Sequence, residues 1–437
     1  MRIHQIIRRT YYSVKIVTES PLSISNGEND NTDSDVLING SGEFFVPGTS
    51  LAGAFRNYIG ISKDTDCIYG YSSGEKGRMS SVIVSDMYFD NGRKLVRSVR
   101  DGVALTDEKN VDNKFDMEII EPGITGMIRL EVIQRDGDSY DHEGSILRLM
   151  NGIQSGEIRL GANKNRGFGR LHILGIAERT FDKESRDEWI KECKSGIHNN
   201  SSDDYMTYDE WIKGQESTDR MYVTVTRSLV LRGGISIRRY SAKPGKADFE
   251  HITSNGRPVV PGTSWNGAIR ADAMTILSRL GCSENKIQQL IKQWFGFVDV
   301  RTDNPEPDRN SEKARQSMIV ISESIIEEAR PLPMTRNKIS RFSSGTVDNA
   351  LYSEIAYYDG TTTLQYMIKK DNERSYKALI GLMEIVSGDI AKGYVSIGGL
   401  AGVGRGLFSE DTHSRIIYSE DVDISECMTE LYNIVRD

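Results

Sequence analysis

Two eleven-residue stretches place glycine and hydroxyl side chains where a helix is expected to begin. VPGTSLAGAFR (46–56) and VPGTSWNGAIR (260–270) are identical at eight of their eleven positions. Free backbone N–H groups and the helix dipole at such a turn favour phosphate binding, with an arginine later on each helix as a second cation. The residues expected to bind phosphate here are Gly48, Thr49, Ser50, Arg56, Gly262, Thr263, Ser264 and Arg270. The alternative is a tight turn in which Gly53 and Gly267 allow close packing.

Basic residues also lie in a glycine-rich loop near the end of each half. These loops are GANKNRGFGR (161–170) and GGLAGVGRG (398–406). The basic residues in these loops are Lys164, Arg166, Arg170 and Arg405. Positive charge spread along a loop suits a polyanion contacted at several phosphates. The loops lack the acidic residue and the βαβ order that a dinucleotide site requires, which argues against a nucleotide-binding metabolic enzyme.

The elements that must position these loops occur twice in the chain. Besides the turn, 78–86 matches 315–323, 111–119 matches 347–355, and 156–171 matches 393–408 with an offset that shrinks from 237 to 235. Four blocks in the same order indicate a duplicated domain. We expect a first domain at 1–178, an acidic connector with one short helix at 179–218, and a second domain at 219–437.

Hydrophobic patterning predicts the same α+β order, β–α–β–β–α–β, in each half. This order is typical of the ferredoxin-like fold, so the chain is predicted to hold two tandem ferredoxin-like domains with long inserted loops. Ser50 is expected to cap the first helix. The expected strands are 11–19, 81–89, 127–134, 157–161 and 167–177, then 221–231, 318–324, 361–369, 394–398 and 404–409. The expected helices are 51–59, 143–154, 264–281 and 376–388.

Composition sets the class of protein. The 437 residues are 38% hydrophobic and 27% charged, and no apolar run approaches the ~20 residues of a membrane helix. The four cysteines are scattered, which disfavours a zinc ribbon or a disulfide framework. No signal-peptide pattern is found, so a cytoplasmic protein is expected. A net charge of −8 disfavours a general duplex binder and leaves local basic grooves open.

The paired turns and loops resemble a known family. VPGTSLAGAFR and VPGTSWNGAIR are similar to the IPGSSLKGxxR signature of the RAMP superfamily, and NRGFGRL and GVGRGLF resemble its G-rich loop. The chain looks most like a backbone subunit of type III CRISPR–Cas effector complexes, as a double-RAMP fusion. The resemblance implies RRM-like domains that bind guide RNA, and thumb-like hairpins, here 100–116 and 336–352 with Arg336 and Arg341, inserted between guide and target RNA.

The resemblance also implies chemistry. In the family, an Asp in the loop before the turn cleaves target RNA with a divalent metal, which would be Mg²⁺. By position this role falls on Asp33 and Asp248, and both residues would contact the metal; Asp30 and Asp35 compete with Asp33. Both copies lack the family's proline two residues after the Asp. His251 follows Asp248 closely but has no equivalent in the first half.

Three functional alternatives stay open. The chain could cleave target RNA at two sites, it could be a catalytically inert guide-binding backbone subunit, or it could be a guide-processing endoribonuclease. The expected partners are guide RNA, complementary target RNA and other subunits of the effector complex, with no membrane. The duplication and the paired turns disfavour the processing enzyme, which typically relies on a His.

Overall fold

The computed structural model describes residues 5–25, 32–60, 62–74, 76–90, 96–105, 111–215, 220–240, 247–298, 314–348, 350–411 and 416–436. Two compact units divide the chain: one holds residues 1–164 and 168–220, and the other holds 165–167 and 221–437. The second unit therefore begins close to the predicted position 219. Among the described residues, no helix is long and apolar enough to cross a membrane.

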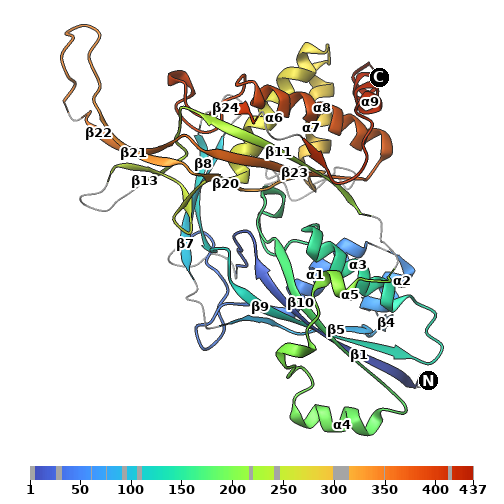
Figure 1. The fold of residues 1–437 in the computed structure, drawn as a ribbon. Coiled ribbons are helices and arrows are strands. Elements are labelled where there is room, and N and C mark those ends of the chain that lie inside the picture. Colours follow the sequence, from blue (N-terminus) through green and yellow to red (C-terminus); the bar gives the residue numbers. More distant parts are fainter. Residues whose placement is uncertain are drawn as a thin grey trace. The chain divides into compact units, whose positions relative to one another are not determined.

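The first unit has one main sheet, with strands in the order β10-β1-β9-β6-β2 and with β5 also paired to β9. Figure 1 shows helices α1, α3 and α5 on one side of this sheet and α4 on the other. The core between the sheet and α1 and α3 contains Ile16, Phe55, Ile128 and Met150. The bounds are β1 (Ile6–Thr18), β2 (Phe45–Val46), α1 (Gly48–Ile59), β5 (Val82–Val84), β6 (Met87–Phe89), β9 (Thr125–Arg135), α3 (His142–Ser155), β10 (Leu171–Asp182), α4 (Arg186–Ser195) and α5 (Tyr208–Trp211).

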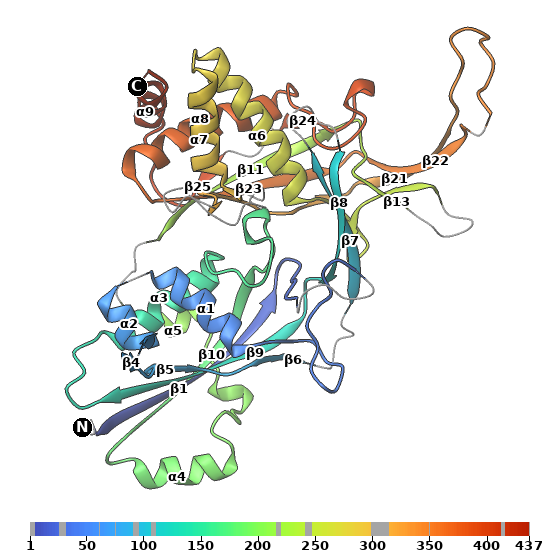
Figure 2. The same ribbon diagram turned by 180° about the vertical axis from the view of Figure 1, so that it is seen from behind.

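The second unit repeats this order with a sheet arranged β15-β16-β20-β23-β11-β24, in which β19 also pairs with β23. Figure 2 shows α6, α7 and α8 grouped together beside β11 and β23. Trp265 and Trp294 are fully buried in its core. The bounds are β11 (Tyr222–Arg232), β15 (Thr253–Ser254), β16 (Arg257–Val260), α6 (Gly262–Arg279), α7 (Glu284–Phe295), β19 (Ile319–Ile321), β20 (Ser324–Glu327), β23 (Thr361–Lys369), α8 (Glu373–Ala391), β24 (Leu407–Glu410), β25 (Ile417–Tyr418) and α9 (Ile424–Arg436).

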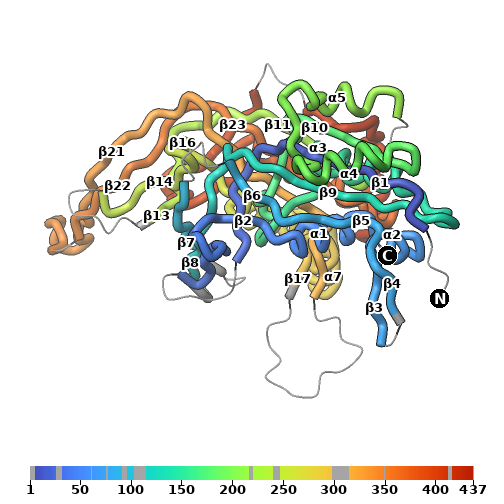
Figure 3. Tube along the Cα trace, turned by 90° about the horizontal axis from the view of Figure 1, so that it is seen from below, coloured from blue at the N-terminus to red at the C-terminus, as the bar shows by residue number. Residues whose placement is uncertain are grey.

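Each unit carries an inserted antiparallel hairpin. In the first, β7 (Arg97–Leu105) pairs with β8 (Val111–Ile120), and in the second, β21 (Arg330–Arg336) pairs with β22 (Tyr352–Tyr358). β22 also joins a small sheet with β12 (Gly234–Ile235), β14 (Phe249–His251) and β13 (Arg238–Tyr240). A third hairpin, β3 (Tyr71–Ser73) and β4 (Lys76–Arg78), follows α2 (Lys63–Tyr69), as Figure 3 shows.

The mixed α+β class is confirmed, and several local predictions are wrong. The segments 157–161 and 394–398 are not strands; the first makes only an isolated bridge between Arg159 and Arg170. In both units the chain leaves the preceding helix, α3 or α8, through a glycine with positive φ, Gly156 or Gly393. It then turns at once into the glycine-rich loop. Ser50 does not cap α1, because the helix begins two residues earlier with Pro47 as its N-cap residue.

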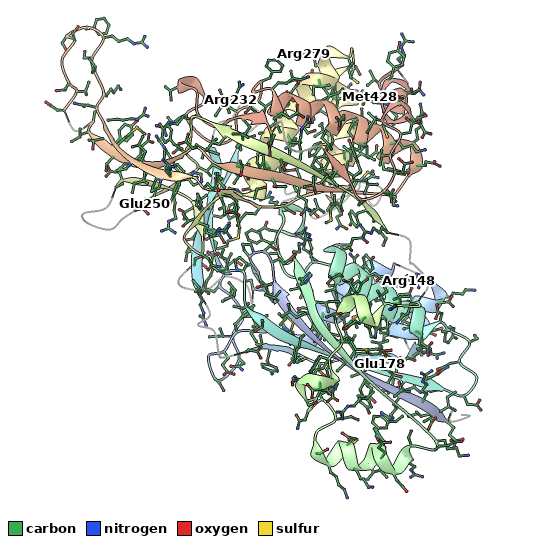
Figure 4. All side chains as sticks on the ribbon, viewed as in Figure 1. Arg148, Glu178, Arg232, Glu250, Arg279 and Met428 are labelled. Carbon is green, nitrogen blue, oxygen red and sulfur yellow. The ribbon has the colours of Figure 1, made fainter. Side chains whose placement is uncertain are left out.

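The predicted connector is largely part of the first unit. Strand β10 continues to Asp182, and Met206 bridges Ile176 at the edge of that strand. Trp211 is buried in the first unit's core, and its Nε1 donates to Glu178 Oε2 at 3.0 Å; Figure 4 labels Glu178 beside α5. The described part of the segment 179–218 therefore packs on the first unit and does not stand apart as a linker.

Candidate nucleic-acid interface

The two Pro-Gly turns begin helices in the same way. The Gly48 N–H at the start of α1 donates to Asp86 Oδ1 at 2.7 Å, so a carboxylate already occupies one of the donors proposed for phosphate. A Cβ on Gly48 would meet Val84 O at 2.5 Å, and one on Gly262 would meet Ile321 O at 2.5 Å. Glycine is thus required here because the helix start touches the backbone of the neighbouring strand. Thr49, Ser50 and Thr263 are exposed and Ser264 is half-buried, so hydroxyl groups remain at each turn.

The arginines on these helices lie at a distance from the turns. Arg56 and Arg270 lie eight residues after Gly48 and Gly262, which is ~12 Å along a helix. Arg56 instead donates to Gly70 O at 2.7 Å and pairs with Asp66 at 2.5 Å. Arg56 is therefore engaged away from its turn, whereas the role of Arg270 stays a prediction.

Gly53 and Gly267 are exposed, and a Cβ at either would meet nothing within 4 Å. The packing explanation for these two glycines is therefore wrong as well. Each lies on the exposed side of its helix, at the same position in both units.

The glycine-rich loops close in the same way in both units. Leu160 N donates to Gly169 O at 3.0 Å, and Ile397 N donates to Gly406 O at 2.8 Å. These pairs keep a constant offset of 237, so the drift to 235 in the sequence alignment is not structural. Arg405 consequently occupies the position of Phe168, and Arg170 has no arginine counterpart.

The cations of these loops differ in what they can offer an RNA. Arg166 is exposed and Lys164 is half-buried. Arg170 Nε pairs with Glu19 Oε2 at 2.7 Å. Arg405 is buried, and its Nη2 lies 3.1 Å from Glu354 Oε1. Because Arg405 is buried and paired with Glu354, it can offer an RNA only its remaining donor, whereas Arg166 is open to solvent.

Asp33 and Asp248 contact the returning strands of the two hairpins at equivalent places, at Asp116, which pairs with Asp101, and at Ser353, which pairs with Thr335. This part of each hairpin is called its foot. Asp33 Oδ2 accepts from Asp116 N at 2.9 Å, and Asp116 Oδ1 accepts from Asp33 N at 3.0 Å. Asp248 Oδ2 accepts from Ser353 N at 2.7 Å and from Ser353 Oγ at 3.0 Å. These bonds from Ser353 hold the pKa of Asp248 below its usual range. Both carboxylates thus bind the returning strand of their own hairpin.

The other residues that the sequence offered for catalysis have different surroundings from Asp33 and Asp248. Asp30 lies outside the described residues. Asp35 Oδ1 accepts from Thr32 Oγ1, within its own loop. His251 is buried, with Nδ1 accepting from Ile237 N at 3.0 Å and Nε2 within 3.0 Å of Val259 O. Both ring nitrogens are engaged by the backbone, so His251 is a structural residue.

The residues named from the sequence in the second hairpin lie near each other, at the loop end of β21 and on the loop that follows it. Arg336 ends β21 and pairs through Nε with Glu354 Oε1 at 3.1 Å. Arg341 is exposed on the connecting loop beside Phe342, whose side chain is fully exposed. The corresponding tip of the first hairpin, 106–110, lies outside the described residues.

Sequence reasoning missed the partners that hold these groups, namely Asp86, Asp116, Ser353 and Glu354. Glu354 had a usable signal, since the repeat places Glu118 at the same position in the first half. No sequence signal marked Asp116 or Ser353, because these residues reach Asp33 and Asp248 only when distant parts of the chain come together.

The two units share their α+β order, the start of a helix at a Pro-Gly turn and the closure of the glycine-rich loop, as copies of one domain do. The RAMP superfamily matches this chain twice, over residues 15–172 and 222–409. The chain therefore belongs to the RAMP superfamily. This membership indicates a CRISPR-associated RNA-binding subunit. No curated protein matches the sequence.

Proposed function

We propose that this chain is a backbone subunit of a type III CRISPR–Cas effector complex. In this proposal each unit is a ferredoxin-like RAMP domain with a thumb-like hairpin, and the two units bind guide RNA in series. Each unit cleaves complementary target RNA once, with Asp33 acting in the first and Asp248 in the second. The observation that carries the proposal is the equivalent attachment of the two carboxylates to the feet of the two hairpins.

The hairpins supply the geometry that RNA cleavage needs. The loop of the second hairpin exposes Phe342 fully and Ile339 by 64%, beside the exposed Arg341. An apolar tip with an adjacent cation suits insertion between bases, where an aromatic ring stacks on a base and arginine contacts the backbone. A nucleotide displaced at that step can bring its 2′-hydroxyl in line with its own phosphate.

In this proposal, the nucleotide that each hairpin displaces reaches the Asp that is bound to the returning strand of that hairpin. An ionised carboxylate there can orient the 2′-hydroxyl and accept its proton. Asp248 stays ionised at neutral pH because Ser353 donates two hydrogen bonds to it and lowers its pKa. Cleavage by the 2′-hydroxyl leaves a 2′,3′-cyclic phosphate on the 5′ product.

A divalent metal fits the first site better than the second. Within the described residues, no group of three or more His, Cys, Asp or Glu side chains could hold an ion. Mg²⁺ commonly takes only one or two carboxylates plus substrate phosphates. Asp33 and Asp116 would supply two in the first unit, whereas Asp248 has the hydroxyl of Ser353 beside it. When bound, the metal would stabilise negative charge on the phosphate.

An inert backbone subunit is the second candidate, and one observation favours it. The same hydrogen bonds that place Asp33 and Asp248 also give each carboxylate a purely structural role as a staple between loop and hairpin. The guide-processing enzyme is the third candidate; His251, the histidine near Asp248, is buried and held at both nitrogens and is not available to it as a base.

Cleavage of a labelled target RNA by the assembled complex with Mg²⁺ tests these alternatives. We expect Asp33→Ala to abolish one cut and Asp248→Ala the other, with guide binding kept and with EDTA stopping both. Asp203→Ala, on an exposed turn of the first unit, is the matched control and should leave both cuts unchanged.

Two cuts that persist in the Asp33→Ala/Asp248→Ala double variant would rule out these catalytic roles. No cut by the wild type, with guide RNA still bound, would favour the inert backbone subunit. Loss of one cut only, by one single variant, would mean that the other unit keeps the fold without the chemistry.

A further inference from the structure

Three guanidinium groups surround one buried carboxylate at the foot of the second hairpin. Glu354 on β22 has no exposed surface. Its Oε2 lies 2.9 Å from Arg238 Nη2, and its Oε1 lies 3.1 Å from both Arg336 Nε and Arg405 Nη2. One negative charge therefore faces three positive charges.

The neighbouring acids do not cancel this excess. Asp248 is bound to Ser353, and Glu250 lies opposite Arg239 in the register of β14 and β13; Figure 4 labels Glu250 close to this hairpin. Adding Arg239, Asp248 and Glu250 to the group gives four cations against three anions. The carboxylate of Asp248 is moreover already satisfied by two donors from Ser353.

Two of the arginines face solvent and are held in place. The side chains of Arg238 and Arg336 are each 31% exposed. The Arg238 guanidinium lies 4.7 Å from the centre of the Phe249 ring and 5.7 Å from that of Tyr352. Stacking of this kind pre-organises a guanidinium, so less conformational freedom is lost when it binds an anion.

The third arginine lies behind them with a donor to spare. Arg405 is 3% exposed, and its Nη1 is buried without a hydrogen-bond partner. A buried guanidinium nitrogen left unpaired is costly, and an anion or its bound water would satisfy it.

Among the described residues of the first unit, two ion pairs lie at the same place, each with one cation and one anion: Arg97 pairs with Glu118 at 3.7 Å, and Arg100 lies 3.8 Å from Glu121. Phe168 takes the place of Arg405 in the loop register, and its ring lies under Arg100.

We propose that Arg238, Arg336 and Arg405 form a phosphate-binding site at the foot of the second hairpin, and that the first unit lacks it. The site takes one phosphodiester of a single-stranded RNA, an identification of the ligand that rests on the proposed function. It positions RNA beside Asp248 through fixed cations, where the first unit has the paired carboxylates of Asp33 and Asp116.

Binding of a fluorescent single-stranded RNA to the full chain, measured over a range of salt concentrations, tests this site. Arg238→Gln and Arg336→Gln should each weaken binding roughly tenfold, as expected for one charge-assisted hydrogen bond. Each should also reduce the salt slope by about 0.7, the value for one single-strand phosphate contact. Arg238→Lys should keep the salt slope while it weakens binding, because the charge stays and the stacked fork is lost. Arg97→Gln is the matched control in the first unit and should change neither quantity.

Inorganic phosphate distinguishes the source of the ligand and does not depend on RNA binding. We expect phosphate to raise the Tm of the wild type and of Arg97→Gln, and to leave that of Arg238→Gln unchanged. A phosphate effect without any RNA effect would overturn the RNA phosphodiester as ligand. Variants that lower the Tm but leave both the salt slope and the phosphate response intact would overturn the site altogether, since the arginines would then only stabilise the hairpin. A wild type that binds no RNA at all would instead count against the proposed function.

Discussion

The ionisable residues at the foot of the second hairpin are held in opposite ways by their surroundings. Asp248 is exposed at its surface, and its pKa is lowered by two hydrogen bonds from Ser353. His251, three residues later, is buried, and burial lowers its pKa to about 4. Hydrogen bonding favours the charged form of the acid, whereas desolvation favours the neutral form of the base. Within four residues, the chain therefore exposes the ionised carboxylate of Asp248 and buries the neutral imidazole of His251.

The neutral state of His251 predicts an acid-sensitive second unit. Its folded pKa of about 4 lies below the ordinary histidine pKa of 6.5, so between these values the unfolded chain binds more protons than the folded one. Stability therefore falls as the pH drops from 6.5 toward 4, by roughly 3 kcal/mol from this group when the shift is complete. Denaturant unfolding at pH 7 and pH 4.5 should show a smaller difference for His251→Gln than for the wild type. An equal difference in both would contradict the assignment.

At the scale of elements, the glycines that the two units share are of two kinds. Some lie in the glycine-rich loops, and others lie on helices α1 and α6. Gly169 and Gly406 have φ values of 76° and 70°, and a Cβ at either would lie 1.9 Å from the carbonyl oxygen of Leu160 or Ile397 on the facing side of the loop. Gly53 and Gly267 lie on exposed helix surfaces in open space. The first pair is required by the fold, and the second pair is not.

Alanine substitutions should separate these two kinds of glycine. Gly406→Ala should destabilise the protein by about 2 to 4 kcal/mol, because the left-handed backbone and the close carbonyl both oppose a Cβ. Gly267→Ala, the matched control in the same unit, should stabilise it by roughly 0.5 to 1 kcal/mol, since a helix interior favours alanine. Urea unfolding of both variants measures the difference. If Gly267→Ala raises stability but weakens RNA binding, the exposed helix surface contacts RNA.

At the scale of the whole molecule, the division between the units falls close to residue 220 and not at the end of the first repeat. The segment after strand β10 returns to the first unit, where Trp211 is 7% exposed and Tyr208 donates to Asn151. The duplicated domain has thus added a segment to its first copy, and that copy depends on it.

A fragment of residues 1–220 should therefore fold more stably than one of residues 1–178. The shorter fragment lacks Trp211 and leaves the edge of β10 without Met206. In the full chain, Trp211→Ala should cost about 3 to 5 kcal/mol, the usual range for a buried tryptophan. Trp189→Ala on helix α4 should cost less, because Trp189 is only half-buried, although its Nε1 donates to Tyr11 and its ring contacts Arg9. Circular dichroism during thermal unfolding compares all four proteins, and equal melting of the two fragments would mean that the segment is only a linker.

Much of the architecture could be read from local pattern. The helices at 142–155 and 373–391 and the strands at 222–232 and 361–369 follow hydrophobic periodicity, which depends only on nearby residues. Short helices such as α2 and the small strands around β14 were missed, because their formation depends on packing against distant segments. The segments 157–161 and 394–398 have strand-like composition, yet the glycine at the end of the preceding helix turns them into loops.

By itself, the sequence determined the duplication, the α+β class, the family and the position of the two Asp loops, because all of these are recorded in residue order and periodicity. Only the tertiary structure decided which charges meet. Arg56 lies eight residues along the helix from its turn and donates to Gly70 O, and Arg405 is buried against Glu354. Asp33 and Asp248 bind hairpin residues that are 83 and 105 positions away in the sequence. Pairings of this kind arise from strand register and helix rise in three dimensions. Two halves with the same motifs can therefore differ in the charge at the foot of their hairpins.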